Sequence, residues 1–252
     1  METVAAIICA AGSSTRMGGI KKEYRLLDGG QTGGLTDGLT VLGAAVSAFA
    51  AVPEISVVVI TVPAEAETGE AAARLALPPR LLAGESGGDC SPAIHFVSGG
   101  ATRQASVLNA LSALAACPPD YVLIHDGARP WVSPALIRRI IAEVKIHSAV
   151  IPLLPLTETP KETDAPLDSA NTVFIQRHLK RAVAGAAQTP QAFAFPAIFA
   201  AHQRAAQTAV EYTDDAEVWA FFCDPATAAL PSPVAAILGE AENRKITFPE
   251  DL

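Results

Sequence analysis

Five short apolar runs, each rich in β-branched residues, constrain the fold of this 252-residue chain more than any other feature. They are VAAIICA (4–10), ISVVVITV (55–62), AIHFVSG (93–99), YVLIHDG (121–127) and SAVIPLL (148–154). The apolar residues are continuous rather than alternating, which is typical of strands covered on both faces in a parallel sheet. We therefore predict that each run is a buried strand.

Helical patterns lie between these runs. TRQASVLNALSALAAC (102–117) predicts a helix whose apolar face consists of Val107, Leu108, Leu111, Leu114 and Ala115. SPALIRRIIAEV predicts a second helix, with Ser133 as N-cap and Pro134 in its first turn. The alternation of strands and helices predicts an α/β fold with a doubly wound, mostly parallel sheet.

Three stretches interrupt this alternation. Residues 27–38 and 77–92 are rich in Gly, Pro and polar residues, so we predict surface loops there. Residues 154–180 lack a long helical period, and we expect them to form a protruding β-hairpin arm.

Composition excludes several classes of protein. Half of the residues are hydrophobic and 17% are charged, which excludes disorder for the bulk of the chain. A net charge of -8 argues against broad electrostatic binding to nucleic acid or anionic lipid, because such binding needs clustered cations.

Cysteines and apolar segments bear on the cellular location. The four cysteines are far apart in sequence, which favours structural thiols in a reducing cytoplasm; they are Cys9, Cys90, Cys117 and Cys223. The opening METVAAIICAAGSS carries Glu2 instead of a cationic region, so we interpret it as a strand and not a signal peptide. The uncharged segment 40–52 is too short to span a bilayer.

The first cationic cluster follows the first predicted strand, in AAGSSTRMGGIKKEY. At the carboxyl end of a parallel strand, the backbone N–H groups of Gly12, Ser13 and Ser14 can form an anion nest, with Arg16 and Lys22 adding full charges. The stretch matches neither G-x-G-x-x-G nor the P-loop pattern. It predicts a polyphosphate site, and the alternative is an ordinary turn with solvated cations.

A second cluster, HDGARP (125–130), follows the fourth predicted strand. Asp126 would offer a hard oxygen ligand for Mg²⁺ beside the guanidinium of Arg129. The alternative is that Asp126 caps the turn and pairs with Arg129. We expect His125 to have a packing or supporting role, and we interpret Thr213 in EYTDDAEV as the start of a helix with acidic residues in its first turn.

The ordered set of motifs resembles a known family. AAGSSTRMG, SGGATRQASVLNAL, HDGARP, ETPK, QTPQAF, YTDDA and NRKITFPEDL occur in the order found in 2-C-methyl-D-erythritol 4-phosphate cytidylyltransferases of the non-mevalonate isoprenoid pathway. The resemblance implies a Rossmann-like nucleotidyltransferase of the nucleotide-diphospho-sugar transferase type. The implied reaction is in-line attack of the sugar-alcohol phosphate on the α-phosphorus of CTP, which releases pyrophosphate.

The resemblance also implies roles for individual residues, motif by motif. The nucleotide-binding residues would be Ala10, Ala11, Gly12, Gly100, Arg103 and Ser106, of which the last three help to select cytosine. The catalytic cations would be Arg16, Lys22 and Lys245. The methylerythritol phosphate side would consist of Asp126, Arg129, Thr159, Arg181 and Thr189, with Asp126 also holding Mg²⁺ or another divalent cation.

The implied assembly is a cytoplasmic homodimer with one nucleotidyltransferase domain over 1–252. The arm at 154–180 would cross to the partner subunit and complete its substrate site. A related enzyme that uses another alditol phosphate, such as ribitol 5-phosphate, is an alternative, and a non-catalytic nucleotide-binding regulator is a second.

Three departures from the family pattern affect these expectations. Lys21 replaces a usual proline, so we expect a less rigid loop, and Ala101 replaces an acidic residue of the base-recognition loop. The sequence ends at PEDL, where the family usually continues into a helix. We expect either that this helix is absent or that the sequence is part of a longer chain, such as one with a fused second enzyme.

Overall fold

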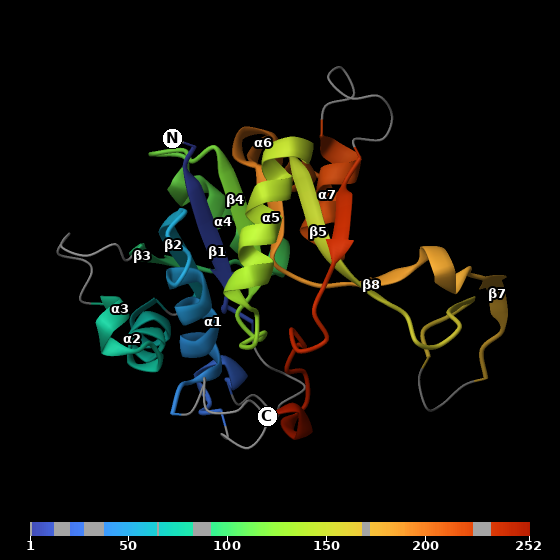
Figure 1. The fold of residues 1–252 in the computed structure, drawn as a ribbon, viewed down its shortest axis with the longest axis horizontal. Helices are drawn as coiled ribbons and strands as arrows, with labels where there is room; N and C mark the ends of the chain where they lie inside the picture. Colours follow the sequence, from blue (N-terminus) through green and yellow to red (C-terminus); the bar gives the residue numbers. More distant parts are fainter. Residues whose placement is uncertain are drawn as a thin grey trace.

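A sheet of eight strands forms the centre of the computed structural model (Figure 1). The structure describes residues 2–12, 21–27, 38–64, 66–82, 92–167, 172–223 and 233–252, without the side chains of 66–68. The strand order is β10-β5-β9-β4-β1-β2-β3, and β8 pairs with β5 at the side of this path. In the described residues, no helix has the length and apolarity needed to cross a bilayer.

All five predicted strands are present. They are β1 (Val4–Cys9), β2 (Ile55–Val62), β3 (Ala93–Ser98), β4 (Tyr121–Asp126) and β5 (Ala149–Pro155). Strands β1 to β4 pair in parallel, with β1 between β2 and β4. The prediction of a doubly wound, mostly parallel α/β fold is therefore confirmed.

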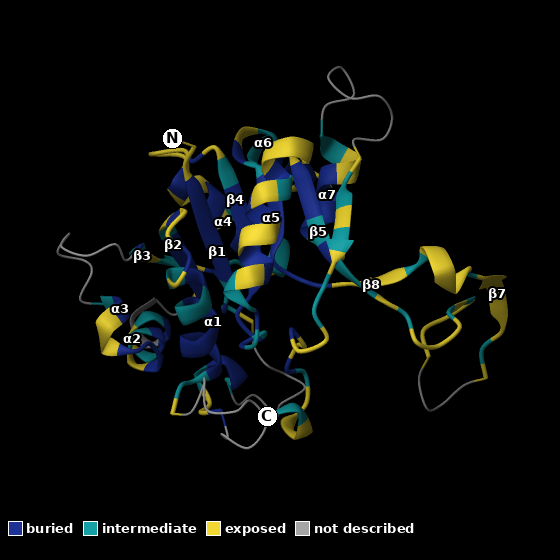
Figure 2. Cartoon of the chain, in the orientation of Figure 1, coloured by how far each residue is buried: buried dark blue, intermediate teal, exposed yellow. Residues whose placement is uncertain are grey.

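Helices cover both faces of this sheet, which explains the continuous apolar runs. Within β1, Ala6 and Ile8 pack into one core, and Ala5 and Ile7 pack into the other. The first core includes residues of α1 (Val41–Ala50), α2 (Ala66–Ala76), α3 (Pro79–Leu82) and α5 (Pro134–His147). The second includes residues of α4 (Arg103–Leu114), α6 (Phe195–Ala205) and α7 (Asp215–Phe222). Figure 2 shows the resulting buried centre.

Three further strands of the sheet were not predicted, and one of them is β8 (Gly185–Ala187), which pairs antiparallel with β5. Strand β9 (Gln191–Ala194) runs antiparallel between β4 and β5, and β10 (Ala235–Leu238) pairs in parallel with β5. Phe193 of β9 is fully buried and stacks on Trp219 with ring centroids 5.5 Å apart. Its packing joins β9 to α7 on the second face.

The helix predictions are confirmed with one correction. Ser133 caps α5 by accepting a hydrogen bond from the Leu136 N–H, as predicted. In the helix predicted over 102–117, Ala115 is exposed and Leu108 is only half-buried, while Ala110 is fully buried. The predicted apolar face of α4 was therefore wrong at its edge, because α4 ends at Leu114, before Ala115.

The structure confirms the predicted arm but describes only part of the two predicted loops. Residues 28–37 and 83–91 lie outside the described part of the chain, but α3 shows that 77–92 is not entirely loop. The arm is present, and its hairpin of β6 (Lys161–Thr163) and β7 (Ile175–His178) protrudes from the body (Figure 1). It returns through the short helix η4 (Arg181–Val183) to β8 (Gly185–Ala187).

His125 is a fully buried polar residue at the end of β4. Its Nε2–H donates to the Arg129 carbonyl at 3.1 Å, so Nδ1 is the acceptor for the Thr189 hydroxyl at 3.0 Å. Its ring packs on Phe49 with centroids 5.0 Å apart. Burial lowers the pKa of His125 to about 4, so the ring is neutral at pH 7 and supports the turn that follows β4.

His125 should make the free energy of unfolding depend on pH. Between pH 6.5 and 4 the unfolded chain binds a proton at this ring and the native chain does not, so stability falls as pH falls. The loss is on the order of 3 kcal/mol across this interval. His125→Gln should flatten the pH dependence, measured by urea unfolding at several pH values.

The matched control for this measurement is His147→Gln, because the His147 side chain is 48% exposed. The control should keep the wild-type pH dependence. Equal slopes in wild type and His125→Gln would contradict the prediction.

Candidate active site

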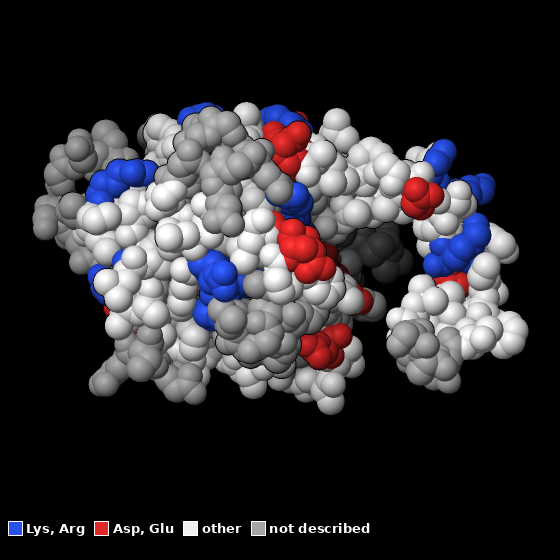
Figure 3. Space-filling view, turned by 90° about the horizontal axis from the view of Figure 1, so that it is seen from below, with Lys and Arg blue, Asp and Glu red and all other residues white. Residues whose placement is uncertain are grey.

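The carboxyl ends of β1 and β4 lie next to each other, because Cys9 pairs with Asp126 in the parallel register. The segment Ala10 to Gly12 and the turn from Asp126 to Arg129 follow these strands at the same edge of the sheet. This edge is where doubly wound folds bind ligands. Figure 3 views the molecule from this side and shows basic and acidic side chains on a face with much uncharged surface.

The segment after β1 is held by contacts on both sides. The Ala10 N–H donates to the Thr61 carbonyl and lies 3.2 Å from Thr61 Oγ1. Lys21 Nζ donates to the carbonyls of Ala10 and Gly12. Lys21 thus contacts the described residues on the other side of the loop, and the lower rigidity expected for the loop stays a prediction, because residues 13–20 lie outside the described part of the chain. Ser13, Ser14 and Arg16 lie outside the described residues.

Asp126 is surrounded by three cations. Its Oδ2 lies 2.8 Å from Lys245 Nζ and 3.5 Å from Arg129 Nε, and its Oδ1 lies 3.5 Å from Arg103 Nε. Burial alone would raise the pKa of this carboxyl, but Lys245, Arg103 and Arg129 together hold the pKa far below its usual range. The Asp126–Arg129 pair, which the sequence left as the alternative to a metal site, is present within a larger cluster that includes distant parts of the chain.

The segment near the C-terminus brings two predicted lysines close to this cluster. Lys22 is buried in the short helix η2 (Lys22–Tyr24), and its Nζ donates to the Ile246 carbonyl at 2.7 Å. Lys245, the preceding residue, contacts Asp126. The Ile246 N–H donates to the Ala128 carbonyl at 2.9 Å, which fixes this segment against the turn after β4.

The base-recognition loop predicted from the sequence lies against the segment after β1. A Cβ at Gly99 would lie 2.3 Å from the Cβ of Ala11, so only glycine permits this approach. The Gly100 N–H donates to the Ser106 hydroxyl at 3.0 Å, and Arg103 begins α4. Gly100, Arg103 and Ser106 are thus close to the predicted nucleotide segment.

The acidic pair in EYTDDAEV separates into two roles. Asp214, and not the predicted Thr213, is the N-cap of α7: its Oδ1 accepts from the Glu217 N–H at 2.8 Å. The side chain of Asp215 points elsewhere, and its Oδ2 accepts from Arg103 Nη2 at 2.7 Å. Sequence reasoning missed this contact, because no local pattern links Arg103 to Asp215.

The predicted sugar-phosphate residues fall into two groups. Thr189 lies in the site, where its hydroxyl accepts from the Asp126 N–H at 3.1 Å. Thr159 and Arg181 are exposed on the arm, where Arg181 Nη1 donates to the Thr157 carbonyl at 2.7 Å. Within one chain the structure does not bring them to Asp126.

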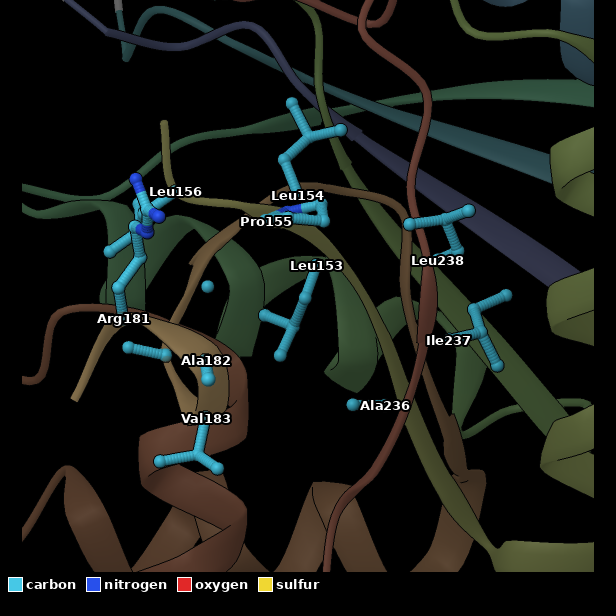
Figure 4. A pocket seen from close by; sticks show the side chains of 12 residues that line it. Leu153, Leu154, Pro155, Leu156, Arg181, Ala182, Val183, Ala236, Ile237 and Leu238 are labelled. Atoms are coloured by element: carbon cyan, nitrogen blue, oxygen red, sulfur yellow. The ribbon is translucent and has the colours of Figure 1, made fainter. Parts of the chain in front are cut away.

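An open apolar hollow of about 620 Å³ lies at the root of the arm, separate from the Asp126 cluster (Figure 4). Its lining comes from β5, η4, β8, β10 and adjacent residues, and includes Leu153, Leu156, Val183 and Ile237. Arg181 also lines it. A mainly apolar lining suits a protein partner better than a phosphate group.

The arrangement around Asp126 suits a polyanionic ligand. Lys22, Arg103, Arg129 and Lys245 place four fixed cations at one sheet edge of an acidic protein. Among the described residues no group of three or more His, Cys, Asp or Glu side chains forms a metal cage. A metal at this edge would therefore take Asp126 together with oxygens of the ligand.

Comparison with known proteins agrees with this geometry. The family model of 2-C-methyl-D-erythritol 4-phosphate cytidylyltransferase (IspD) matches residues 4–252. The bifunctional enzyme IspD/IspF of Bradyrhizobium sp. (strain ORS 278) is 39% identical over 258 residues, which cover 99% of this chain and 55% of that protein. The same-named protein of Rhodospirillum rubrum is 36% identical over 253 residues, or 100% of this chain and 56% of that protein. The chain spans about half the length of these relatives.

Solved structures lead to the same family. The 2-C-methyl-D-erythritol 4-phosphate cytidylyltransferase of Thermus thermophilus superposes with a TM-score of 0.64 at 30% identity, covering 100% of this chain and 95% of that chain. The 4-diphosphocytidyl-2C-methyl-D-erythritol synthase of Anaerococcus prevotii superposes with a TM-score of 0.72 at 26% identity, covering 99% and 92%. The chain belongs to the 2-C-methyl-D-erythritol 4-phosphate cytidylyltransferase family.

Proposed function

We propose that this chain joins CTP and 2-C-methyl-D-erythritol 4-phosphate to give 4-diphosphocytidyl-2-C-methyl-D-erythritol and pyrophosphate. The observation that carries the proposal is the cluster of Lys245, Arg103 and Arg129 around Asp126 at the carboxyl edge of β1 and β4. Membership in the family supplies the identity of the two substrates.

The proposed step is an in-line displacement at phosphorus. An oxygen of the 4-phosphate attacks the α-phosphorus of CTP, the bond from the α-phosphorus to the bridging oxygen breaks, and its electron pair leaves with pyrophosphate. The attacking phosphate is already ionised, so positioning and charge neutralisation are the main requirements. No general base is needed, which agrees with the complete burial of His125.

Charge neutralisation is the role we assign to the cations. Lys22 and Lys245 would stabilise the negative charge that grows on the leaving pyrophosphate, and Arg16 would join them on the evidence of the sequence alone. On the nucleotide side, the backbone of Ala10, Ala11 and Gly12 would approach the triphosphate, while Gly100, Arg103 and Ser106 would help to select cytosine. On the other side, Arg129 and Thr189 would bind the methylerythritol phosphate.

The residues present fit a magnesium ion. Mg²⁺ in nucleotide sites uses one or two carboxylates together with phosphate oxygens. Asp126 is a carboxylate of this kind, and its low pKa keeps it ionised throughout the neutral range. When bound there, Mg²⁺ or another divalent cation would neutralise phosphate charge.

The proposed assembly is a cytoplasmic homodimer built from one nucleotidyltransferase domain over 1–252. The arm at 154–180 would be the dimerisation element, because it exposes Leu167, Phe174 and Ile175 by 80%, 71% and 53%. The apolar hollow at its root offers a matching surface. Thr159 and Arg181 would then complete the partner's site.

The free thiols of Cys9, Cys117 and Cys223 support a reducing compartment.

The direct test is pyrophosphate release from CTP in the presence of Mg²⁺. We expect release with 2-C-methyl-D-erythritol 4-phosphate and none without it. Faster turnover with ribitol 5-phosphate than with 2-C-methyl-D-erythritol 4-phosphate would show that the substrate is another alditol phosphate. CTP binding without any release would identify a regulator instead of an enzyme.

Lys245→Ala should lower kcat on the order of 10²-fold, with a smaller effect on the KM for CTP. The reason is that a preorganised cation acts mainly on charge that appears in the transition state. Steady-state kinetics with both substrates measure the two constants. Lys145→Ala is the control, because Lys145 lies on α5 and pairs with Glu2. A variant with normal kcat and a raised KM would show that Lys245 contributes only uniform binding.

The shared site predicts complementation between two impaired chains. Lys245→Ala and Arg181→Ala should each have little activity alone, and co-expression should restore roughly a quarter of wild-type activity. With random pairing, half of the dimers are mixed, and each mixed dimer has one intact site of two. Subunit mixing is checked with two affinity tags. Mixed dimers without activity would show that the arm serves its own chain.

A further inference from the structure

A buried acidic and imidazole pair lies behind the Asp126 cluster. Asp215 opens α7 and His202 lies on α6, and their side chains are 1% and 0% exposed. His202 Nε2 is 3.2 Å from Asp215 Oδ1. Neither residue was given a role in the proposed reaction, so the pair requires an explanation of its own.

A buried carboxylate is costly unless it is paired. Burial raises the pKa of Asp215, but Arg103 and His202 more than offset this effect and lower the pKa to about 2. Asp215 is therefore ionised at neutral pH. Its other oxygen, Oδ2, accepts the 2.7 Å hydrogen bond from Arg103 Nη2. The pair thus holds one end of the Arg103 guanidinium from inside the protein.

Arg103 bridges the buried pair and the candidate site. Its Nε faces Asp126 Oδ1 at 3.5 Å, while its Nη2 binds Asp215. Among the described residues, the hydrogen bond to Asp215 uses one of the five N–H groups of the guanidinium, and the contact with Asp126 is an ion pair at longer distance. The side chain is 32% exposed, so part of it remains accessible to a ligand.

The short contact to Asp215 limits how closely Arg103 approaches Asp126. A guanidinium between two carboxylates has its plane and position fixed by the stronger hydrogen bond, which is the 2.7 Å bond to Asp215. Without the charge of Asp215, the attraction of Asp126 would act alone and draw Arg103 toward it. The N–H groups that remain for a ligand would then change direction.

We propose that Asp215, supported by His202, is a positioning residue that fixes the guanidinium of Arg103 for nucleotide binding. The inference rests on the proposed function, because it takes CTP as the ligand of Arg103. Asp215 does not touch the nucleotide. Its effect on CTP passes through the contact between Asp215 Oδ2 and Arg103 Nη2.

The first measurement compares two neighbouring carboxylates. Asp215→Asn should raise the KM for CTP on the order of tenfold and change kcat much less, because Arg103 contributes uniform binding. Asp214→Asn is the matched control: it removes a charge one residue away, at the N-cap, where Asn is equally suitable. The control should keep the wild-type KM. Equal effects of the two substitutions would overturn the proposal.

A double-mutant cycle separates positioning from a general structural role. In an Arg103→Ala background, Asp215→Asn should have no further effect on the KM for CTP, because its route to the ligand is already removed. Thermal unfolding of every variant identifies losses caused by instability. If the KM of the double variant equals the product of the two separate fold-changes, Asp215 acts without Arg103. That result would refute the inference.

His202 provides a second route to the same answer if Asp215→Asn fails to fold. His202→Gln keeps a polar side chain beside Asp215 Oδ1 and should retain a KM for CTP close to that of wild type. His202→Phe removes the polar contact of 3.2 Å and should raise the KM; a normal KM in a folded Phe variant would argue against the supporting role. Calorimetric titration with CTP repeats the comparison without turnover. If the wild-type chain releases no pyrophosphate, the proposed function is refuted. If the wild type is active but Asp215→Asn and Arg103→Ala affect the KM for CTP independently, only the positioning role is refuted.

Discussion

The contacts of the Asp126 carboxylate with three cations are the interaction on which the site depends. A buried carboxylate requires compensation, and here it comes from the start of α4, from the turn after β4 and from the segment near the C-terminus. Two of the cations are fixed in turn by a second contact: Arg103 by Asp215, and Arg129 by the Asn243 carbonyl at 2.8 Å. One charge at the sheet edge thus links parts of the chain that are distant in sequence.

The central fold could be predicted because its signal is local. Strands buried on both faces need continuous apolar residues, and β1 to β5 carry them. Strand β9 has no such signal: it is four residues long and begins with Gln191, whose side chain binds Asp214 and the Ala216 N–H. It is a strand because its backbone pairs with β4 on one side and with β5 on the other. This pairing depends on the tertiary structure and leaves no local signal in the sequence.

The candidate site was predictable to the extent that it follows the strands. Asp126 and Arg129 are three residues apart, and their position after an apolar run was sufficient to place both at the sheet edge, with their pairing left as an alternative to a metal site. The contact of Lys22 with the Ile246 carbonyl joins residues 224 positions apart, and that of Arg103 with Asp215 joins residues 112 apart. The family resemblance implied a catalytic role for Lys22 and a nucleotide-binding role for Arg103. It could not identify the residues that these two side chains contact inside the protein.

The charges of the site also bear on what kind of anion it can bind. Lys245 and Lys22 already have oxygen partners, in Asp126 and in the Ile246 carbonyl, so an entering anion exchanges contacts instead of simply adding them. A ligand gains from this exchange only if it offers several negative oxygens at once, because one charge would leave Asp126 without a counter-ion. A triphosphate with a divalent cation would meet both needs, since its oxygens would contact the cations and Asp126 would hold the metal. Under the proposed function, this acidic protein would hold a polyanion at this edge, because four of its cations lie there and have partners in the protein before the ligand arrives.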